Sequence, residues 1–379
     1  MISDMRVLVV MPGVGADGGA EHSLRALLPR LLADGHQVHL AVLTGVQALV
    51  GEFERAGVVT HDLSSASSVR RRVVELREVV RAIRPDLVHA TLFDAAVPAQ
   101  IVGRATGVPV LVTWAVTLYD DDHFAESAAN AAKLRVTQQV EATLARLCRT
   151  RFHAVTEGVA RVNGRTLRVP SGRVRVGERG RPSPEWTRAA PPDRPDGVPP
   201  TGRYLLAVGR QEPQKGYPEL LVAFDQVAEA FGDVHLVVAG REGNDSRRID
   251  STVASLRFAE RVHLLGQRDD VAALIAGAEA VVCASKREGA AGALIESMSA
   301  GVPVVSVRLP GLEGVITDGF DGLVVDRSDL AEGLRRLLGD ADLGERLGTG
   351  GLATFVQRFT VAAAVDQMEQ IYRWAAEPG

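Results

Sequence analysis

Apolar and polar positions along the chain follow one pattern that occurs twice. Each time, a short apolar strand is followed by a loop that contains glycine, a long helix and a second apolar strand. The first copy runs through RVLVVMPG, VGADGGAEHSLRALLPRLLADGH and QVHLAVL, and the second runs through YLLAVGR, QEPQKGYPELLVAFDQVAEAFGD and VHLVVAG. Gly35 and Gly232 stand where glycine commonly ends a helix. Each copy therefore predicts the opening of a Rossmann-like unit.

Further short apolar segments continue both halves. They are LVHA, VPVLVTW and RFHAVT in the first half, and VHLLG, AVVCAS, VPVVSV and GLVV in the second. Helical stretches separate them, and this alternation predicts an α/β protein with doubly wound parallel sheets. A chain of 379 residues is also long enough to bury two cores.

A proline-rich segment separates the two halves. Residues 181–202 carry seven of the 18 prolines and no sustained apolar period, which is typical of a linker. We expect a first domain over residues 1–180, the linker over 181–202 and a second domain over 203–355. The final helix, within 356–379, could cross back to the first domain. Two such domains would face each other across a cleft, and ligands bind beyond the carboxyl ends of parallel strands.

Composition narrows the class of protein. Hydrophobic residues make up 46% of the chain and the net charge is −4, which favours a globular enzyme over a disordered chain or a nucleic-acid binder. The two cysteines, Cys148 and Cys283, lie far apart in apolar surroundings and predict neither a disulfide framework nor a cysteine-based metal site. No apolar run approaches the roughly 18 residues of a membrane span, and MISDMRVLVVMPG has no basic leader. We expect a cytoplasmic protein without a transmembrane segment.

A cluster of arginines, Arg70, Arg71 and Arg72, is best interpreted as a solvated helix face. Such a cluster can also touch an anionic surface, so peripheral membrane contact stays open.

The glycines after the first strand allow two interpretations. Gly13, Gly15 and Gly18 match G-x-G-x-x-G, but a dinucleotide site would need an acid at the end of the second strand, and QVHLAVLTG has none. Gly18 and Gly19 are better explained as a phosphate or substrate loop, with a simple tight turn as the alternative.

Two glutamates, Glu288 and Glu296, bracket the segment EGAAGALIE at a predicted loop-to-helix junction. Gly289 and Gly292 would let the backbone approach a ligand, and the first amides of a helix bind anions such as a diphosphate. Glu296 lies about two turns further on, on a roughly similar face. Both acids could instead be ordinary surface glutamates near a helix start.

Two cations follow the first strand of the second half, Arg210 and Lys215 in GRQEPQKG. Positive groups there would neutralise a diphosphate, and they would stabilise the charge that a departing nucleoside diphosphate gains. As isolated loop residues they could equally be solvated surface charges.

Three segments of the second half, VGRQEPQKGYPELLVAF, ERVHLLGQRDDV and ASKREGAAGALIESMSAGVPVVSVRLPGLEGVITDGFDGLVV, resemble the retaining family 4 glycosyltransferases (glycosyl transferases group 1) of GT-B fold. The resemblance is strong over 204–325 and weaker through GGAEHSLRALLPRLLADGHQV, RPDLVHA and GVPVLVTW in the first half. It implies two Rossmann-like domains facing a cleft, and transfer of a sugar from a nucleoside-diphosphate donor to an acceptor hydroxyl of a glycan, glycolipid or natural product.

The resemblance also implies roles for residues. Arg210 and Lys215 would bind the donor diphosphate, Glu288 would contact sugar hydroxyls and Glu296 would hold the ribose. Further donor contacts fall near Gly18, Gly19, Gly266, Gln267, Ala291 and Gly292. Neither a metal nor another cofactor is implied, and the run Asp120 to Asp122 is expected to be solvated or to meet a cationic acceptor.

The chain departs from the family at one place. Many relatives carry a histidine after the strand matched by VPVLVTW, whereas this chain has Trp114 and Ala115. His89 and His153 could partly substitute, although each is more simply expected to be packed and hydrogen-bonded. We expect the acceptor pocket to be lined by residues that follow strand ends, namely His89, Thr91, Asp94, Thr113 and Trp114.

Other functions remain compatible with this fold. A GT-B protein could be a sugar-nucleotide epimerase, a phosphorylase with pyridoxal phosphate on a lysine, or a sugar-nucleotide binder without catalysis.

Overall fold

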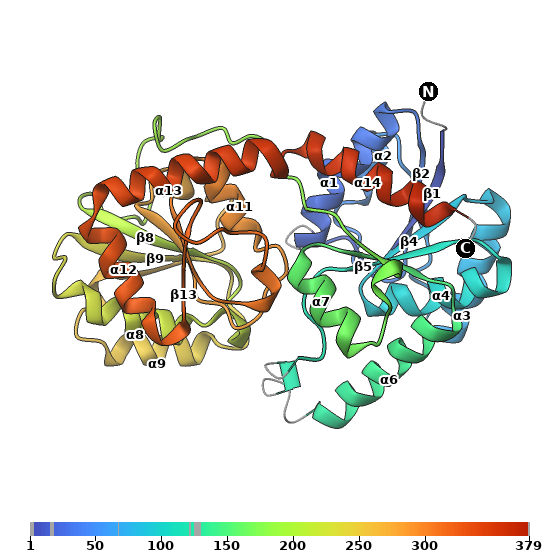
Figure 1. The fold of residues 1–379 in the computed structure, drawn as a ribbon, viewed down its shortest axis with the longest axis horizontal. Helices are drawn as coiled ribbons and strands as arrows, with labels where there is room; N and C mark the ends of the chain where they lie inside the picture. The colour runs from blue at the N-terminus through green and yellow to red at the C-terminus, as the bar shows by residue number, and fades with distance from the viewer. Residues whose placement is uncertain (1–3, 16–18, 67, 121–122, 125–129, 378–379) are drawn as a thin grey trace. The chain divides into compact units, whose positions relative to one another are not determined.

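The chain forms two compact units in a computed structural model that describes residues 4–15, 19–66, 68–120, 123–124 and 130–377 (Figure 1). Unit 1 comprises Met1–Gly180 and Val361–Gly379, and unit 2 comprises Arg181–Thr360. The chain therefore leaves unit 1, completes unit 2 and returns.

Unit 1 is built on a parallel sheet with the order β3-β2-β1-β4-β5-β6-β7. Its strands are β1 (Arg6–Met11), β2 (Gln37–Val42), β3 (Val59–Asp62), β4 (Leu87–Thr91), β5 (Val110–Trp114), β6 (Arg151–Ala154) and β7 (Val174–Val176). The helices between them are α1 (Gly19–Ala33), α2 (Val50–Arg55), α3 (Val69–Ile83), α4 (Phe93–Thr106), α6 (Ala131–Leu147) and α7 (Glu157–Thr166). The strand order changes direction between β1 and β4, as in doubly wound folds.

Helix α14 (Val361–Ala376) completes the core of unit 1, beside α1 (Figure 1). Val365, Met368, Ile371 and Tyr372 are buried with the inward-facing residues of β1 and β2 and with α1. Apolar residues at a spacing of three and four along α14 form this buried stripe, as expected for an amphipathic helix.

Unit 2 is built on a second parallel sheet, with the order β10-β9-β8-β11-β12-β13. Its strands are β8 (Arg203–Val208), β9 (Val234–Ala239), β10 (Val262–Gly266), β11 (Ala280–Cys283), β12 (Val304–Val307) and β13 (Leu323–Val325). Its helices are α8 (Tyr217–Ala228), α9 (Ser246–Ser255), α10 (Val271–Ala276), α11 (Gly292–Ser299), α12 (Leu330–Gly339) and α13 (Ala341–Thr354). The direction changes between β8 and β11, so the two loops after these strands meet at the switch point.

The proline-rich segment belongs to unit 2 and lies against the rest of it. The Arg188 amide donates to the Ala300 carbonyl at 2.9 Å, and the Arg188 guanidinium donates to the carbonyls of Ala278 and Glu279. At its start, Arg181 forms a parallel bridge with Thr360. Backbone groups of a segment that forms no helix or strand are thus partly satisfied by other residues of unit 2.

Candidate functional site in unit 2

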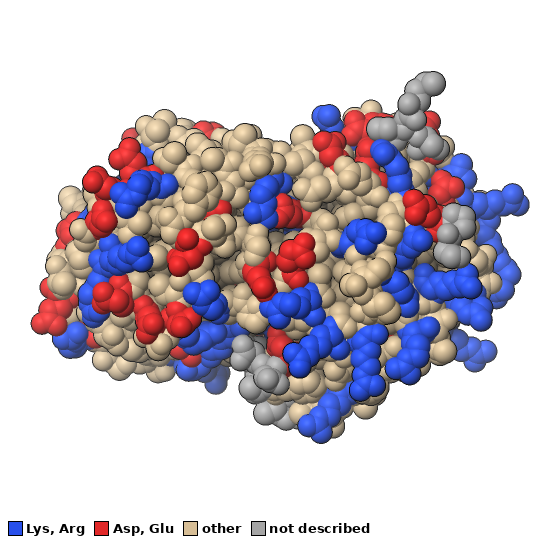
Figure 2. Space-filling view, in the orientation of Figure 1, with Lys and Arg blue, Asp and Glu red and all other residues tan. Residues whose placement is uncertain are grey.

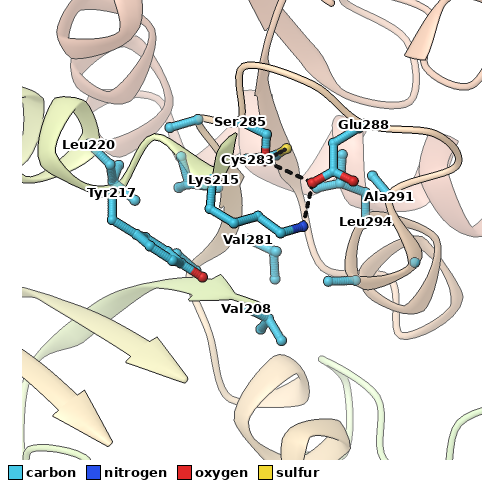
Figure 3. A pocket seen from close by; sticks show the side chains of 15 residues that line it. Val208, Lys215, Tyr217, Leu220, Val281, Cys283, Ser285, Glu288, Ala291 and Leu294 are labelled. Carbon is cyan, nitrogen blue, oxygen red and sulfur yellow. Dashed lines mark hydrogen bonds and ion pairs between the residues drawn. The ribbon is translucent and has the colours of Figure 1, made fainter. Parts of the chain in front are cut away.

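A cavity of about 60 Å³ lies at the switch point of unit 2, where β8 and β11 end (Figure 3). Its wall includes Lys215, Ser285, Glu288, Ala291 and Gly292. Open parallel sheets bind ligands at such points, because the reversal of strand order leaves a crevice beyond the carboxyl ends of the strands.

An ion pair crosses this cavity. Lys215 Nζ lies 2.5 Å from Glu288 Oε1, and the Ser285 hydroxyl donates to the same oxygen at 2.8 Å (Figure 3). The two charged side chains are only 22% and 13% exposed. Burial by itself lowers the pKa of Lys215, but the adjacent Glu288 carboxylate outweighs it and raises that pKa above its ordinary value. The lysine therefore stays positively charged in the pocket at neutral pH.

The cavity floor adds neutral groups. Cys283 Sγ lies 3.5 Å from Ser285 Oγ, and burial raises the pKa of this thiol. Tyr217 donates its hydroxyl to the Gly209 carbonyl at 2.6 Å, and burial raises its pKa as well. Both groups therefore remain protonated at neutral pH, which leaves Lys215 and Glu288 as the charges of the pocket wall.

Close backbone contact brings the two loops together. Gly216, directly after Lys215, has φ +67°, and a Cβ built on it would lie 2.2 Å from the Ala284 carbonyl oxygen. The Lys286 amide donates to the Gln214 carbonyl at 2.7 Å. Only glycine fits this left-handed position against a neighbouring carbonyl, so the Lys-Gly sequence is what places Lys215 beside Glu288.

The start of α11 forms the other side of the cavity. Ala291 stands before the first helical residue with φ 41°, and an alanine side chain cannot cap the helix. Non-glycine residues adopt this left-handed region at a cost of about 1–3 kcal/mol and only where the surroundings enforce it. The amides of the first turn, beginning at Gly292, thus carry the positive end of the helix dipole to the cavity wall.

Other predicted donor residues lie outside the cavity wall. Arg210 is exposed at the end of β8, 3.5 Å from Glu212, although it is near enough for its charge to act on Lys215. Gly266 ends β10 and Gln267 is exposed after it. Glu296, on α11, pairs with Arg181 rather than with groups of this cavity. The structure therefore brings together Lys215, Glu288, Ala291 and Gly292.

Candidate site in unit 1

A second cavity of about 60 Å³ lies in unit 1, and His89, Thr91, Thr113 and His153 belong to its wall. Gly19 begins α1 near it, with Arg179 3.4 Å from where a Cβ would stand, whereas Gly18 lies outside the described residues. Of the predicted acceptor residues, the structure gathers His89, Thr91 and Thr113 here.

A hydrogen-bond chain runs through these buried side chains. His153 Nε2 must donate to the Gly177 carbonyl at 2.8 Å, because a carbonyl only accepts. The remaining nitrogen of a neutral His153 then accepts from Thr113 at 2.9 Å, and Thr113 accepts from His89 Nε2 at 2.6 Å. His89 Nδ1 accepts from the Tyr372 hydroxyl at 2.8 Å.

Burial holds both histidines neutral. It lowers the pKa of His89 to about 3 and that of His153 to about 4. The chain of bonds occupies both nitrogens of each ring. Both histidines are thus packed and hydrogen-bonded, as expected from the sequence.

Trp114 and Asp94, the other two residues expected in the acceptor pocket, do not line this cavity. Trp114 is buried and stacks on Phe152 with ring centroids 4.4 Å apart, because neighbouring residues of a strand point to opposite faces and Thr113 takes the cavity side. Asp94 is exposed in the first turn of α4. Asp120 accepts a bond from the His123 amide, while Asp121 and Asp122 lie outside the described residues.

Basic side chains gather over α6 and α7 (Figure 2, in the orientation of Figure 1). Residues 131–175 contain ten Lys and Arg but only two acids. Val136, Val140 and Leu147 are exposed on α6 among them. Within the described ranges, no three His, Cys, Asp or Glu side chains are grouped to hold a metal, and no helix is long and apolar enough to cross a membrane.

Residues that the sequence interpretation missed are Ser285 and Arg181. Ser285 stands three residues before Glu288, and its hydroxyl is directed to that carboxylate. Arg181 lies 115 positions from Glu296 in a segment without apolar period, so no sequence signal could have paired them.

Comparison with known proteins

Family models match both halves of the chain. The model described as Glycosyltransferase Family 4 matches residues 17–181, and the model described as Glycosyl transferases group 1 matches residues 193–352. The two matches together cover most of the chain.

Curated relatives match over shorter stretches. Phosphatidyl-myo-inositol mannosyltransferase of Mycobacterium leprae (strain TN) is 36% identical over 191 residues, 48% of this chain and 50% of the relative. Lipopolysaccharide core biosynthesis glycosyltransferase LpsE of Rhizobium meliloti (strain 1021) is 30% identical over 170 residues, 44% of this chain and 48% of the relative. The chain thus spans about half the length of the curated relatives it matches.

Solved structures share the fold over almost the whole chain. Sucrose-phosphate synthase from Thermosynechococcus elongatus has a TM-score of 0.81 at 20% identity, covering 98% of this chain and 100% of the other. Anabaena Alr3699/HepE in complex with UDP-glucose has a TM-score of 0.79 at 18% identity, with the same coverage of 98% and 100%. These likenesses confirm the predicted GT-B class with its two Rossmann-like sheets. Because both halves match models of one kind of enzyme, the chain belongs to the family 4 glycosyltransferases.

Proposed function

We propose that this protein transfers a sugar from a nucleoside-diphosphate donor to an acceptor hydroxyl, with retention of configuration and without a metal. The observation that carries the proposal is the ion pair of Lys215 and Glu288 beside the start of α11. A positive side chain, unpaired helix amides and a carboxylate at a switch point match the phosphates and hydroxyls of a sugar nucleotide. The structure of Anabaena Alr3699/HepE was solved with UDP-glucose, which supports this ligand class.

Each group of the pocket has a task in this reaction. The diphosphate binds at the first turn of α11, where Lys215, supported by Arg210, stabilises the negative charge that builds up as the sugar bond breaks. Glu288 Oε1 is held by Lys215 and Ser285, and the other carboxylate oxygen accepts hydrogen bonds from the sugar.

Retention follows from attack on the same face that the diphosphate leaves. The acceptor hydroxyl passes its proton to the departing phosphate, so no strong protein base is required. The histidines of unit 1 fit this scheme, because both are neutral and their ring nitrogens are already engaged.

Cations of the protein take the place of a metal in this proposal, and chelation tests that point. We expect transfer to continue unchanged in EDTA, and added magnesium to restore nothing. Loss of activity in EDTA that magnesium restores would reject metal independence while leaving the transferase reaction intact.

A donor panel tests the reaction itself. UDP-, GDP- and ADP-linked glucose and mannose are incubated with the protein, and release of nucleoside diphosphate is measured, since these enzymes slowly hydrolyse donors without acceptor. We expect release from at least one donor and an α-configured product by NMR when an α-linked donor is used. An epimerised sugar, a requirement for phosphate and pyridoxal phosphate, or tight binding without release would instead support an epimerase, a phosphorylase or a binder.

A further inference from the structure

Glu296 has a charged partner from the start of unit 2. Arg181 Nε lies 2.8 Å from Glu296 Oε1, although the two residues are 115 positions apart in the chain. The Arg181 side chain is 7% exposed, and the Glu296 side chain is 40% exposed. The arginine is therefore enclosed by the protein while the carboxylate reaches solvent.

The backbone of Arg181 is hydrogen-bonded as well as its side chain. Its amide donates to the Phe359 carbonyl at 2.8 Å, and the residue forms a parallel bridge with Thr360. An arginine that is bonded through both its backbone and its guanidinium can orient a partner side chain. Little of its side-chain freedom is left to lose when that partner binds a ligand.

The guanidinium also lies against the start of α11. A Cβ built on Gly292 would lie 2.3 Å from Arg181 Nη2, so this glycine leaves the space that the guanidinium occupies. Gly292 belongs to the wall of the donor cavity, and the positive charge of Arg181 is therefore next to the amides proposed to bind the diphosphate.

A carboxylate has two oxygens and about four acceptor positions. The bond from Arg181 uses part of the capacity of Oε1 and fixes the rotation of the group. Because Glu296 is partly exposed, the remaining capacity can accept the two neighbouring hydroxyls of a ribose.

We propose that Arg181 is a positioning residue of the donor site, which orients Glu296 to accept hydrogen bonds from the ribose of the nucleotide. This inference rests on the proposed function, since it takes a nucleoside diphosphate as the ligand. A purely structural ion pair, tying the proline-rich segment to α11, would also use Arg181 but would not affect recognition of ribose hydroxyls.

Binding of nucleotides to the full chain separates the two roles. By calorimetry, the wild-type protein is titrated with UDP, GDP and ADP, and the best of them is compared with its 2′-deoxy and 3′-deoxy forms. We expect the wild type to bind the ribose form about tenfold more tightly than at least one deoxy form, which corresponds to about 1.4 kcal/mol. Arg181→Met and Glu296→Gln should each reduce this ratio toward one, and the double variant should reduce it no further.

Arg188→Met is the matched control, because Arg188 lies in the same segment and pairs with Glu279 on unit 2. It should keep the wild-type ratio. Should Arg181→Met fail to fold, Arg181→Lys retains the charge with a single point donor in place of the fork, and a reduced ratio in that variant supports the proposal.

Two results would overturn the inference. One is an unchanged ribose-to-deoxyribose ratio in the folded Arg181 variants, and the other is a wild type that binds the nucleotide without distinguishing deoxy forms. A wild type that binds none of the three nucleotides would instead reject the proposed function itself.

Discussion

Replacing Lys215 with methionine removes the ammonium group from the proposed donor pocket and keeps a side chain of similar size. The pair it forms with Glu288 is short, at 2.5 Å, and only 22% and 13% of the two side chains are exposed. Loss of one fixed group that stabilises developing negative charge commonly lowers kcat by about 10²- to 10³-fold. We expect sugar transfer by Lys215→Met to fall by a factor in this range.

The same change should also lower stability, because the Glu288 carboxylate then remains in the pocket with Ser285 as a neutral partner. Breaking a buried ion pair costs about 3–5 kcal/mol, and the residual exposure of both side chains favours the lower end, about 3 kcal/mol. In the double variant Lys215→Met with Glu288→Gln, the unpaired charge is gone and the amide still accepts from Ser285. We expect most of the stability to return while transfer stays low.

Nucleoside diphosphate release measures transfer, and urea unfolding measures the free energy of unfolding. Lys286→Met is the matched control, since Lys286 precedes Glu288 in the same loop but pairs with Glu219 at 2.9 Å. Wild-type transfer by a folded Lys215→Met protein would refute the electrostatic role. So would a double variant that regains transfer along with stability.

Two further predictions concern unit 1. Because His153 has an ordinary pKa of 6.5 and a pKa of about 4 in the fold, the unfolded chain binds its proton first, and roughly 3 kcal/mol of stability should be lost as pH falls from 6.5 toward 4. When urea unfolding is measured at several pH values, the free energy of unfolding should fall less in His153→Gln than in the wild type. The control variant His22→Gln, at an exposed position, should show the wild-type pH dependence. The same pH dependence in all three proteins would contradict a buried neutral His153. The basic and apolar face of α6 should bind anionic phosphatidylglycerol vesicles but not phosphatidylcholine vesicles in sedimentation, and added salt should weaken that binding. The double variant Arg135→Glu with Leu147→Asp should not bind the vesicles, whereas the control variant Arg308→Glu on unit 2 should bind them like the wild type. Equal sedimentation of the two variants would place the membrane contact elsewhere.

Strands with continuous apolar runs were predictable from the sequence, and the two edge strands of the unit 1 sheet were not. The central strands β1 and β8 are buried on both faces and, after a first arginine, read as unbroken apolar segments. β3 (VTHD) and β7 (VRV) lie at the two edges of the unit 1 sheet, contain polar residues and are partly exposed, so no apolar run marks them. Pairing with a neighbour, rather than their own composition, makes them strands.

That residues of the candidate site lie together was predictable where they are close in the chain. Glu288, Ala291 and Gly292 stand within five positions of one another, and the loop after β8 supplies Lys215. The placement of Trp114 required knowing which face of β5 points to the cavity, and the apolar run VLVTW does not reveal it. Arg181 required tertiary structure, because only the return of the chain beside Phe359 brings it to α11.

Unit 2 is a continuous domain inserted into a discontinuous one, and Arg181 pairs with Thr360 at its two ends. During synthesis, unit 2 can fold as soon as its last residue has left the ribosome, whereas the first 180 residues must wait for α14 to fill their core. The end of the chain that is made first is thus the last to become complete. A truncation before Val361 would leave the residues of unit 2 complete and expose the apolar surface that α14 covers in unit 1.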